Sequence, residues 1–205
     1  MLKKKIKLTK RDMESRAKRK LIYEKAFELF KIFGYDNTTI ADICQAAGVS
    51  VGSLYHFYRS KESLLLEISN KLGNTYIPVD ASEENLRSPY EPILNYLLDY
   101  SQEFEKLGVD LTTQIYRVFE RAYVDVEKGT IQPLRAYTTL GSFISAAQEY
   151  GSLDKSMPAD DIVAYFITIS RGLVYEWCLW NGTYSLREKA SRFLPRIIKT
   201  FLIEK

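Results

Sequence analysis

The chain has 205 residues, of which 46% are hydrophobic, and its formal net charge is +3. This length is enough for one large domain or for a small domain joined to a larger one. No run of eighteen apolar residues occurs, so we expect no transmembrane helix, and the charged start of the chain lacks the apolar stretch of a signal peptide. The two cysteines, Cys44 and Cys178, form neither a disulfide framework nor a metal-ligand spacing, which fits a reducing cytoplasm.

The charge is distributed unevenly along the chain. Residues 1–76 contain 15 Lys and Arg against 8 Asp and Glu, whereas the rest of the chain contains 14 against 18. A basic N-terminal third before a mildly acidic body indicates a polyanionic partner at that end, although a solvated tail would also explain the lysines of residues 3–7. Charge alone therefore leaves nucleic acid and plain solvation as alternatives.

The first predicted helix lies within residues 16–33, where apolar residues recur at the spacing of one helix face. Gly34 follows as a C-terminal stop, because glycine accepts the backbone conformation that ends many helices. A turn and an N-cap at residues 36–39 then lead into a short helix that carries Ile40, Ile43 and Ala47.

The next stretch reads AGVSVGSLYHFYRSKE and holds two glycines and the chain's single histidine. Gly48 ends the short helix, and Ser50 can cap the following helix through its hydroxyl. A further helix begins at residues 60–63. A short helix, a tight turn containing glycine and a second short helix form a helix-turn-helix.

A boundary is predicted between residues 74 and 89, which contain Pro78, Pro89 and several small polar residues. Beyond it, glycines separate helical segments at about 90–107, 110–127, 132–150, 158–181 and 185–203. No alternating apolar pattern indicates a sheet, so the sequence predicts an all-α fold in three parts: an N-terminal basic arm, a small helical domain and a larger helical domain, at residues 1–15, 16–76 and 77–205.

The helix-turn-helix predicts an interface for double-stranded DNA. In this motif the second helix enters the major groove through its N-terminal residues. Small residues there, Val51, Gly52 and Ser53, allow the backbone to approach base edges, while Tyr55 and His56 offer polar tips.

Phosphate contacts are expected on either side of the reading helix. Thr39 can combine its hydroxyl with the free N–H groups of a helix N-terminus on one phosphate, and Lys61 starts the following helix. The lysine-rich arm would add salt-sensitive attraction that is independent of DNA sequence.

Residues 38–65, TTIADICQAAGVSVGSLYHFYRSKESLL, resemble the signature of the TetR family of transcriptional regulators. The resemblance covers about residues 16–76 without a gap, and the matching positions are Thr38, Thr39, Ile43, Ala47, Gly48, Val49, Ser50, Gly52, Leu54, Tyr55, Lys61, Glu62 and Leu64. It implies phosphate contacts for Thr39, Tyr55 and Lys61, and base-facing positions for Ser50, Val51, Gly52, Ser53 and His56. It also implies a homodimer whose C-terminal domain binds a small effector and dimerises.

Two positions depart from the family pattern. Phe57 lacks the polar tip that is common there, so it either changes operator preference or only packs. Cys44 replaces the usual alanine and is expected in a packed position, where a reactive thiol is not favoured.

Aromatic residues recur at helical spacing in the larger domain and could line an apolar cavity for an effector, with tyrosine hydroxyls orienting the ligand. They are Tyr96, Tyr100, Phe104, Tyr116, Phe119, Tyr123, Phe143 and Trp177. The alternative is that most of these rings fill a solid core. Glu176, within an apolar helix, is either a ligand contact or an interface hydrogen bonder.

The last two helices are apolar on wide faces, which predicts a four-helix dimer interface. The expected interface residues are Ile169, Gly172, Leu173, Leu194, Ile197, Ile198 and Phe201. Gly172 would allow close approach of another backbone, and Pro195 predicts a kink or a missing hydrogen bond. A two-sided core within a monomer is the alternative.

The function expected from these features is that of a repressor that an apolar or amphipathic effector releases from a pseudo-palindromic operator, and two other functions compete with it. An enzyme is disfavoured because no nucleophile elbow, phosphate-binding glycine loop or metal-ligand cluster occurs, and no cofactor is expected. A protein-interaction module or co-regulator on the same fold, without a small-molecule effector, remains an alternative.

Overall fold

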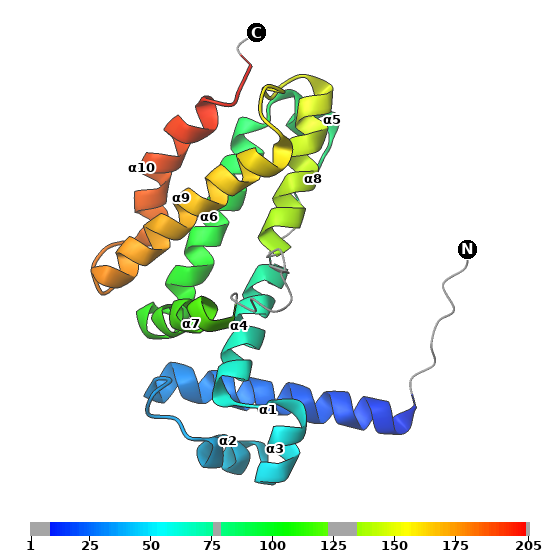
Figure 1. The fold of residues 1–205 in the computed structure, drawn as a ribbon, viewed down its shortest axis with the longest axis vertical. Helices are drawn as coiled ribbons and strands as arrows, with labels where there is room; N and C mark the ends of the chain where they lie inside the picture. Colours follow the sequence, from blue (N-terminus) through cyan, green and yellow to red (C-terminus); the bar gives the residue numbers. More distant parts are fainter. Residues whose placement is uncertain (1–8, 76–78, 123–134, 204–205) are drawn as a thin grey trace. The chain divides into compact units, whose positions relative to one another are not determined.

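The computed structural model describes residues 9–75, 79–122 and 135–203, excepting the side chains of residues 70, 72–75, 119–122 and 135–137. Among these residues the chain is helical, and the strand-like pairing is limited to an isolated antiparallel bridge between Leu153 and Leu202 (Figure 1). The chain divides into two compact units, Met1–Glu67 and Ile68–Lys205. The all-α prediction is therefore confirmed.

The first unit contains α1 (Lys10–Phe33), α2 (Ile40–Ala47), α3 (Val51–Phe57) and the beginning of α4 (Lys61–Thr75). Figure 1 shows α1 lying across α2 and α3. The buried side chains of this unit include Ile22, Ala26, Phe30, Ile43, Ala47 and Leu54, each at most 6% exposed. This small core orients α2 and α3 relative to α1.

The start of α1 differs from the sequence prediction. The helix begins at Lys10 rather than near residue 16, so the second half of the expected arm is helical. Thr9 is the N-cap: its hydroxyl accepts a hydrogen bond from the Asp12 backbone N–H at 3.2 Å, and the Asp12 carboxylate accepts one from the Thr9 N–H at 3.0 Å. This capping box satisfies donors that would otherwise fray the first turn. Residues 1–8 of the arm lie outside the described residues.

The second unit begins with the remainder of α4. Six helices follow it among the described residues, α5 to α10 in chain order. Their bounds are Glu83–Arg87, Tyr90–Leu107, Val109–Ala122, Arg135–Tyr150, Ala159–Leu179 and Leu186–Lys199. The most extensive packing joins α6 to α10 and α8 to α9. The bounds of α6 match the prediction, whereas α5 lies in a segment that the sequence placed in the boundary. The expected segments 110–127 and 132–150 partly fall outside the described residues.

Helix α9 is the most apolar helix of this unit. It has 21 residues, and an 18-residue stretch of it has a mean hydropathy of 1.3, so by length and composition alone it could cross a membrane. One face carries buried residues from Ile162 to Trp177 that belong to the core of the unit. That packing identifies α9 as the central helix of a folded domain.

Helix α10 ends earlier than expected and continues through its proline. Pro195 lies inside the helix and has no N–H to donate to the preceding turn. After Lys199 the chain turns and pairs with the segment before α9: Asp154 N–H donates to Phe201 O at 2.9 Å, and Ile203 N–H donates to Ser152 O at 3.2 Å. This pairing replaces the last turn predicted for the helix.

Candidate nucleic-acid interface

The N-terminus of α2 is closed by a second capping box. The Thr39 hydroxyl accepts from the Asp42 backbone N–H at 3.2 Å and donates to the Asp42 carboxylate at 2.7 Å, while the Thr39 N–H donates to the same carboxylate at 2.8 Å. These bonds hold the pKa of Asp42 below its usual value. Both polar groups of Thr39 are thus engaged within the protein. The N–H groups of the first helical turn, at Ile40 and Ala41, have no intrahelical acceptor and are the donors that a phosphate could use.

The turn between α2 and α3 has the geometry expected from its glycine. Gly48 has φ 62° and ψ 38°, the left-handed conformation in which a side chain is disfavoured. Ser50 is the N-cap of α3, and its hydroxyl accepts a hydrogen bond from Ser53 N–H at 3.2 Å. The predicted helix end at Gly48 and the predicted N-cap at Ser50 are both confirmed, and the Ser50 hydroxyl is engaged in that cap.

Helix α3 packs against the unit on one side and is exposed to solvent on the other. Leu54 is completely buried and anchors the helix, whereas Val51 is 48% and Tyr55 is 49% exposed. Gly52 and His56 are exposed as well, and an added Cβ at Gly52 would meet nothing within 4 Å. Ser53 is half-buried. A short rigid helix with small and polar side chains on its open face can enter a major groove.

Lys61 makes contacts that the sequence did not indicate. Its ammonium donates to Tyr35 O at 2.7 Å and to Thr38 O at 3.0 Å, and it lies 4.0 Å from the centre of the Tyr35 ring. These bonds tie the start of α4 to the loop that leads into α2. A phosphate contact by Lys61, as expected from the sequence, would therefore have to replace or share these intramolecular hydrogen bonds.

Three residues near α3 serve packing. Phe57 is half-buried and meets the His56 ring edge-on at 4.9 Å between centroids. Tyr58 is 2% exposed, donates its hydroxyl to Arg19 O at 3.4 Å, and lies under the Arg19 guanidinium. Cys44 is buried, and burial raises the pKa of its thiol, which disfavours the reactive thiolate.

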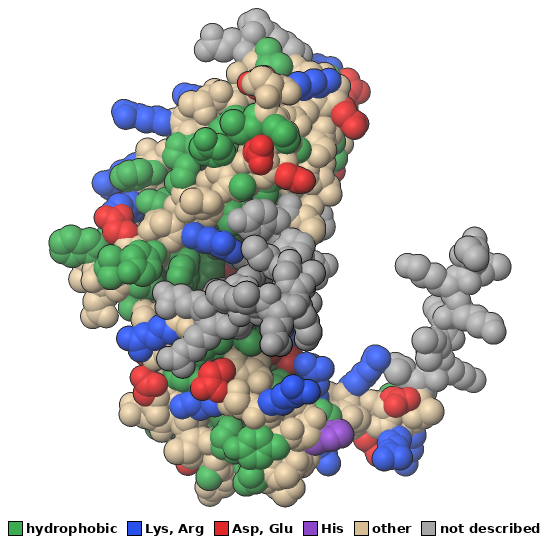
Figure 2. Space-filling model, viewed as in Figure 1, with side chains coloured by type: hydrophobic (Ala, Val, Ile, Leu, Met, Phe, Trp, Pro, Cys, Tyr) green, Lys and Arg blue, Asp and Glu red, His purple; other side chains and the backbone are tan. Residues whose placement is uncertain are grey.

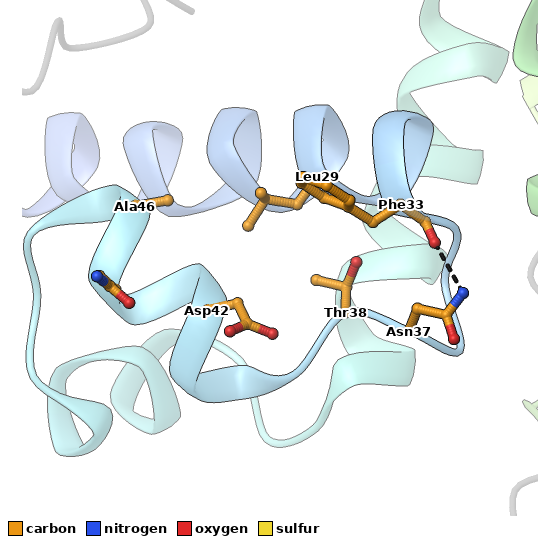
Figure 3. A pocket seen from close by; sticks show the side chains of 7 residues that line it. Leu29, Phe33, Asn37, Thr38, Asp42 and Ala46 are labelled. Atoms are coloured by element: carbon orange, nitrogen blue, oxygen red, sulfur yellow. Dashed lines mark hydrogen bonds between the residues drawn. The ribbon is translucent and has the colours of Figure 1, made fainter.

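A pocket of about 600 Å³ lies between α1 and α2 (Figure 3). Figure 3 shows Leu29 and Phe33 on α1 facing Thr38, Asp42 and Ala46 across it. Asn37 borders the pocket and donates its side-chain amide to Phe33 O at 3.0 Å. The residues predicted to touch DNA do not line this pocket, so the pocket is separate from the exposed side of α3.

The aromatic residues expected around an effector are mostly packed in the core of the second unit. Tyr96, Tyr100, Phe104, Phe143 and Trp177 are each at most 6% exposed and belong to one cluster. Among the described residues these rings contact apolar neighbours, as the core alternative predicts. The side chain of Phe119 and all of Tyr123 lie outside the described residues.

Tyr116 occupies an intermediate position at the edge of this cluster. Its hydroxyl donates to Arg171 O at 3.3 Å, and its ring contacts Phe104 and Tyr175. Burial raises the pKa of this hydroxyl above its ordinary value, so it stays protonated as a donor. Trp177 similarly donates its indole N–H to Tyr184 O at 2.9 Å.

The structure corrects part of the expected dimer interface. Leu194 and Ile198 are completely buried, and Leu173 and Phe201 are 6% and 9% exposed, so they belong to the core of their own protomer. The wide apolar face of α10 is covered on this side by α6 and α9. Of the remaining expected residues, Gly172 is exposed, and Ile169 and Ile197 are half-buried.

Sequence reasoning missed the large apolar side chains that α9 and α10 leave open. Tyr165, Tyr175 and Leu179 are 52%, 54% and 67% exposed, and Phe193 on α10 is 50% exposed. With Gly172 the three α9 residues recur at intervals of three, four and seven, which places them on one helix face. We call Tyr165, Gly172, Tyr175, Leu179 and Phe193 the open face.

Glu176 bonds to its neighbouring helix. Its carboxylate accepts a hydrogen bond from Lys189 at 2.6 Å, which also places the Lys189 ammonium over the Tyr184 ring. The Glu176 side chain is 43% exposed. It thus joins α9 to α10 in the protomer. No group of three or more His, Cys, Asp or Glu that could hold a metal ion occurs in the part of the chain that the structure describes.

Comparison with known proteins gives matches over the helix-turn-helix and over most of the chain. Residues 22–68 match the family model described as bacterial regulatory proteins, tetR family. The transcriptional regulator AcrR of Shigella flexneri is 23% identical over 208 residues, covering 95% of this chain and 94% of AcrR.

Solved structures share the fold at low sequence identity. FadR of Thermus thermophilus, a TetR-family repressor solved with lauroyl-CoA, aligns with a TM-score of 0.61 at 19% identity and covers 91% of this chain and 96% of FadR. SmeT, solved with triclosan, aligns with a TM-score of 0.63 at 14% identity and covers 92% of this chain and 93% of SmeT. The tetR match lies on the very helices that form the candidate interface, so residues 22–68 form a DNA-binding domain of the TetR type, in a chain that resembles the regulator AcrR over most of its length.

Proposed function

We propose that the protein is a homodimeric repressor that binds a pseudo-palindromic DNA operator and leaves it when a small apolar or amphipathic effector binds. The observation that carries the proposal is the exposed side of α3, where Val51, Gly52, Tyr55 and His56 are exposed on a helix that Leu54 anchors. On this proposal α3 enters the major groove. Such a regulator would act in the cytoplasm, where it reaches chromosomal DNA.

The residues of α3 divide by what they can offer to DNA. The methyl groups of Val51 can contact a thymine methyl, and the Ser53 hydroxyl and His56 imidazole can exchange hydrogen bonds with base edges. The Tyr55 hydroxyl, at the exposed end of a long side chain, suits a phosphate oxygen. Ser50 contributes through the cap that fixes the start of the helix.

The open face of α9 and α10 supports the dimer. Exposed aromatic and aliphatic side chains share a face of α9 with Gly172, where an added Cβ would meet nothing within 4 Å in the protomer. Exposed apolar side chains are stabilised when they are covered, and a two-fold contact between copies of one face does so symmetrically. Two readers held by a two-fold axis would match two operator half-sites.

An effector is proposed because two proteins of similar fold were solved in complex with small molecules, FadR with lauroyl-CoA and SmeT with triclosan, and we place it in the second unit. In this chain the Ser170 hydroxyl on α9 is fully buried and has no hydrogen-bond partner among the described residues. A buried polar group of this kind is stabilised by a ligand that bonds to it. The protein would leave the operator because the effector binds more tightly to the conformation in which the two copies of α3 are spaced wrongly for the two half-sites.

A protein-interaction module without an effector is the second candidate. The close packing of Tyr96, Tyr100, Phe104 and Phe143 favours it, because these rings fill space that a ligand would need. Thermal-shift measurements with lauroyl-CoA and triclosan as probes separate the two candidates. A rise in melting temperature together with release of DNA supports the effector. No change with either probe, together with normal DNA binding, supports the interaction module.

The DNA-binding proposal is tested by a gel-mobility shift at low salt. The probe is the DNA upstream of the gene for this protein, and the competitor is a shuffled DNA of equal length and composition. We expect the upstream DNA to be retained in excess of the shuffled competitor, and His56→Ala to reduce that preference while sedimentation remains unchanged. Equal retention of both DNAs by the wild type would contradict the proposal.

A further inference from the structure

The first three turns of α1 form a helix without a core beneath them. No residue from Lys10 to Leu21 is buried, and Ile22 is the first buried side chain of the helix. Local bonds stabilise these turns: the Thr9–Asp12 capping box, and the pairs Lys10–Glu14 at 4.0 Å and Lys20–Glu24 at 3.6 Å. Arg19 contacts Tyr58 and Glu67 of the same unit, whereas the turns before it have no buried side chain and are available to a partner.

One line of side chains on this segment faces α3. Arg11, Ser15 and Lys18 precede Ile22 by eleven, seven and four residues, which places them on the helix face that is buried further along α1. Where α1 packs, this face is apolar; where α1 extends beyond the core, it carries two cations and a hydroxyl.

These side chains form one wall of a groove of about 280 Å³. Its lining from α1 is Arg11, Glu14, Ser15 and Lys18, and its lining from α3 is Ser53, His56 and Phe57. The groove therefore includes residues of the helix proposed to read DNA. Figure 2 shows basic side chains on both sides of the single histidine on this surface.

The charge of the groove favours an anion. Arg11 and Lys18 make no ion pair within the part of the chain that the structure describes, whereas the Glu14 carboxylate lies 4.0 Å from the Lys10 ammonium. Ser15 adds a hydroxyl donor, and the guanidinium of Arg11 can donate two parallel bonds to one phosphate. Two cations without an ion pair and a neighbouring hydroxyl match the chemistry of a phosphodiester.

We propose that this groove between α1 and α3 binds a backbone phosphate of the operator, next to the base pairs that α3 reads. The inference rests on the proposed DNA-binding function and adds to it a phosphate site made by α1. Arg11 and Lys18 hold the phosphate from one side, while His56 and Ser53 border it from the reading helix. The site extends the DNA footprint and fixes the register of α3 on the duplex.

The test compares two double variants with the same change of charge. R11S/K18S removes both cations that line the groove, and R16S/K20S removes two exposed cations from other faces of the same helix segment. Affinity for the upstream DNA is measured by fluorescence anisotropy between 50 and 300 mM salt, values chosen to bracket physiological ionic strength, which is about 150 mM. We expect R11S/K18S to lower the magnitude of the salt slope by about 0.9 per phosphate lost and the affinity by roughly tenfold. R16S/K20S should change both much less, and R11K/K18R should restore them.

Phosphate-ethylation interference then locates the contact. In the wild type, ethylation of phosphates that border the protected bases should block binding, and in R11S/K18S that interference should disappear while the interference inside the site persists. Equal salt slopes and unchanged interference in both double variants would overturn the groove and leave the proposed function intact. A wild-type protein that does not prefer its upstream DNA over shuffled DNA would instead overturn the proposed function and, with it, this inference.

Discussion

The two units of the chain place their candidate functional side chains in opposite environments. In the first unit the expected DNA contacts are on the surface: Val51, Tyr55 and His56 are exposed on a helix that one leucine anchors. In the second unit most of the expected effector contacts are core residues, with Phe143 1% and Trp177 4% exposed. A reading surface must be accessible before its partner arrives, whereas an effector site can coincide with the packing that holds the domain together. Substitutions should therefore separate function from stability in the first unit and combine them in the second.

The largest effect is expected from Phe143→Ala in the second unit. Phe143 is 1% exposed, and removing a buried aromatic ring destabilises a protein by about 3–5 kcal/mol. Chemical denaturation should show this loss, with an effector probe such as triclosan restoring part of it if the ring lines a ligand site. A loss below about 1 kcal/mol would mean that the ring borders open space rather than a packed core.

Lys61→Met tests a residue of the first unit for which stability and DNA contact make different predictions. The substitution keeps the apolar stem and removes two charge-assisted hydrogen bonds to Tyr35 O and Thr38 O, so we expect a loss of about 2 kcal/mol. The salt slope of DNA binding should remain as in the wild type, because Lys61 acts by positioning the loop before α2. A slope reduced by about 0.9 per protomer, with unchanged denaturation, would assign Lys61 to a phosphate instead.

Gly172→Leu tests the open face. An added Cβ at Gly172 meets nothing within 4 Å, so the protomer should keep its stability. A larger side chain at a close contact between two copies should weaken the dimer by about 1–3 kcal/mol, roughly five- to 140-fold in the dissociation constant. Sedimentation velocity measures the shift toward monomer. Ser145→Leu, on the exposed side of α8, is the matched control and should leave the dimer as it is.

The smallest effect is expected from Thr39→Ala, which removes the side-chain half of the capping box at α2. Loss of an N-cap costs about 1 kcal/mol, and the thermal midpoint should fall accordingly. The hydrogen bonds from Thr39 lower the pKa of Asp42 from 3.8, so the folded state gains from the ionised carboxylate above that pH and loses this gain as the pH falls through the lowered value. Thr39→Ala should therefore flatten the loss of stability below about pH 4. An unchanged acid profile would contradict this assignment.

Local signals predicted the first unit well. Gly48 and Ser50 are recognisable from sequence because their roles depend on their own backbone conformation and on neighbours within three residues. The start of α1 at Lys10 was missed, although a threonine followed three residues later by an aspartate, Thr9 and Asp12, is a readable N-terminal signal. With that start, Arg11, Ser15 and Lys18 fall in phase with Ile22, and the basic face toward α3 becomes predictable.

Tertiary contacts explain what the sequence could not give. The acceptors of Lys61 lie 26 and 23 residues away in the chain, so its role in positioning depends on the fold. The wide apolar faces of α9 and α10 predict burial on two sides, but they do not reveal which side the protomer covers. The sequence pattern therefore predicts Leu194 and Ile198 at the interface, whereas the protomer buries both and leaves Tyr175 and Phe193 exposed.

A hydroxyl-radical footprint of the wild-type protein on its own upstream DNA tests the central claim most directly. Two copies of α3 held by a two-fold axis should protect two tracts of related, inverted sequence, with centres about 10 base pairs apart or a multiple of that spacing. Protection of one tract, of two tracts without inverted symmetry, or of none at low salt would contradict the account of this protein as a dimeric operator-binding regulator.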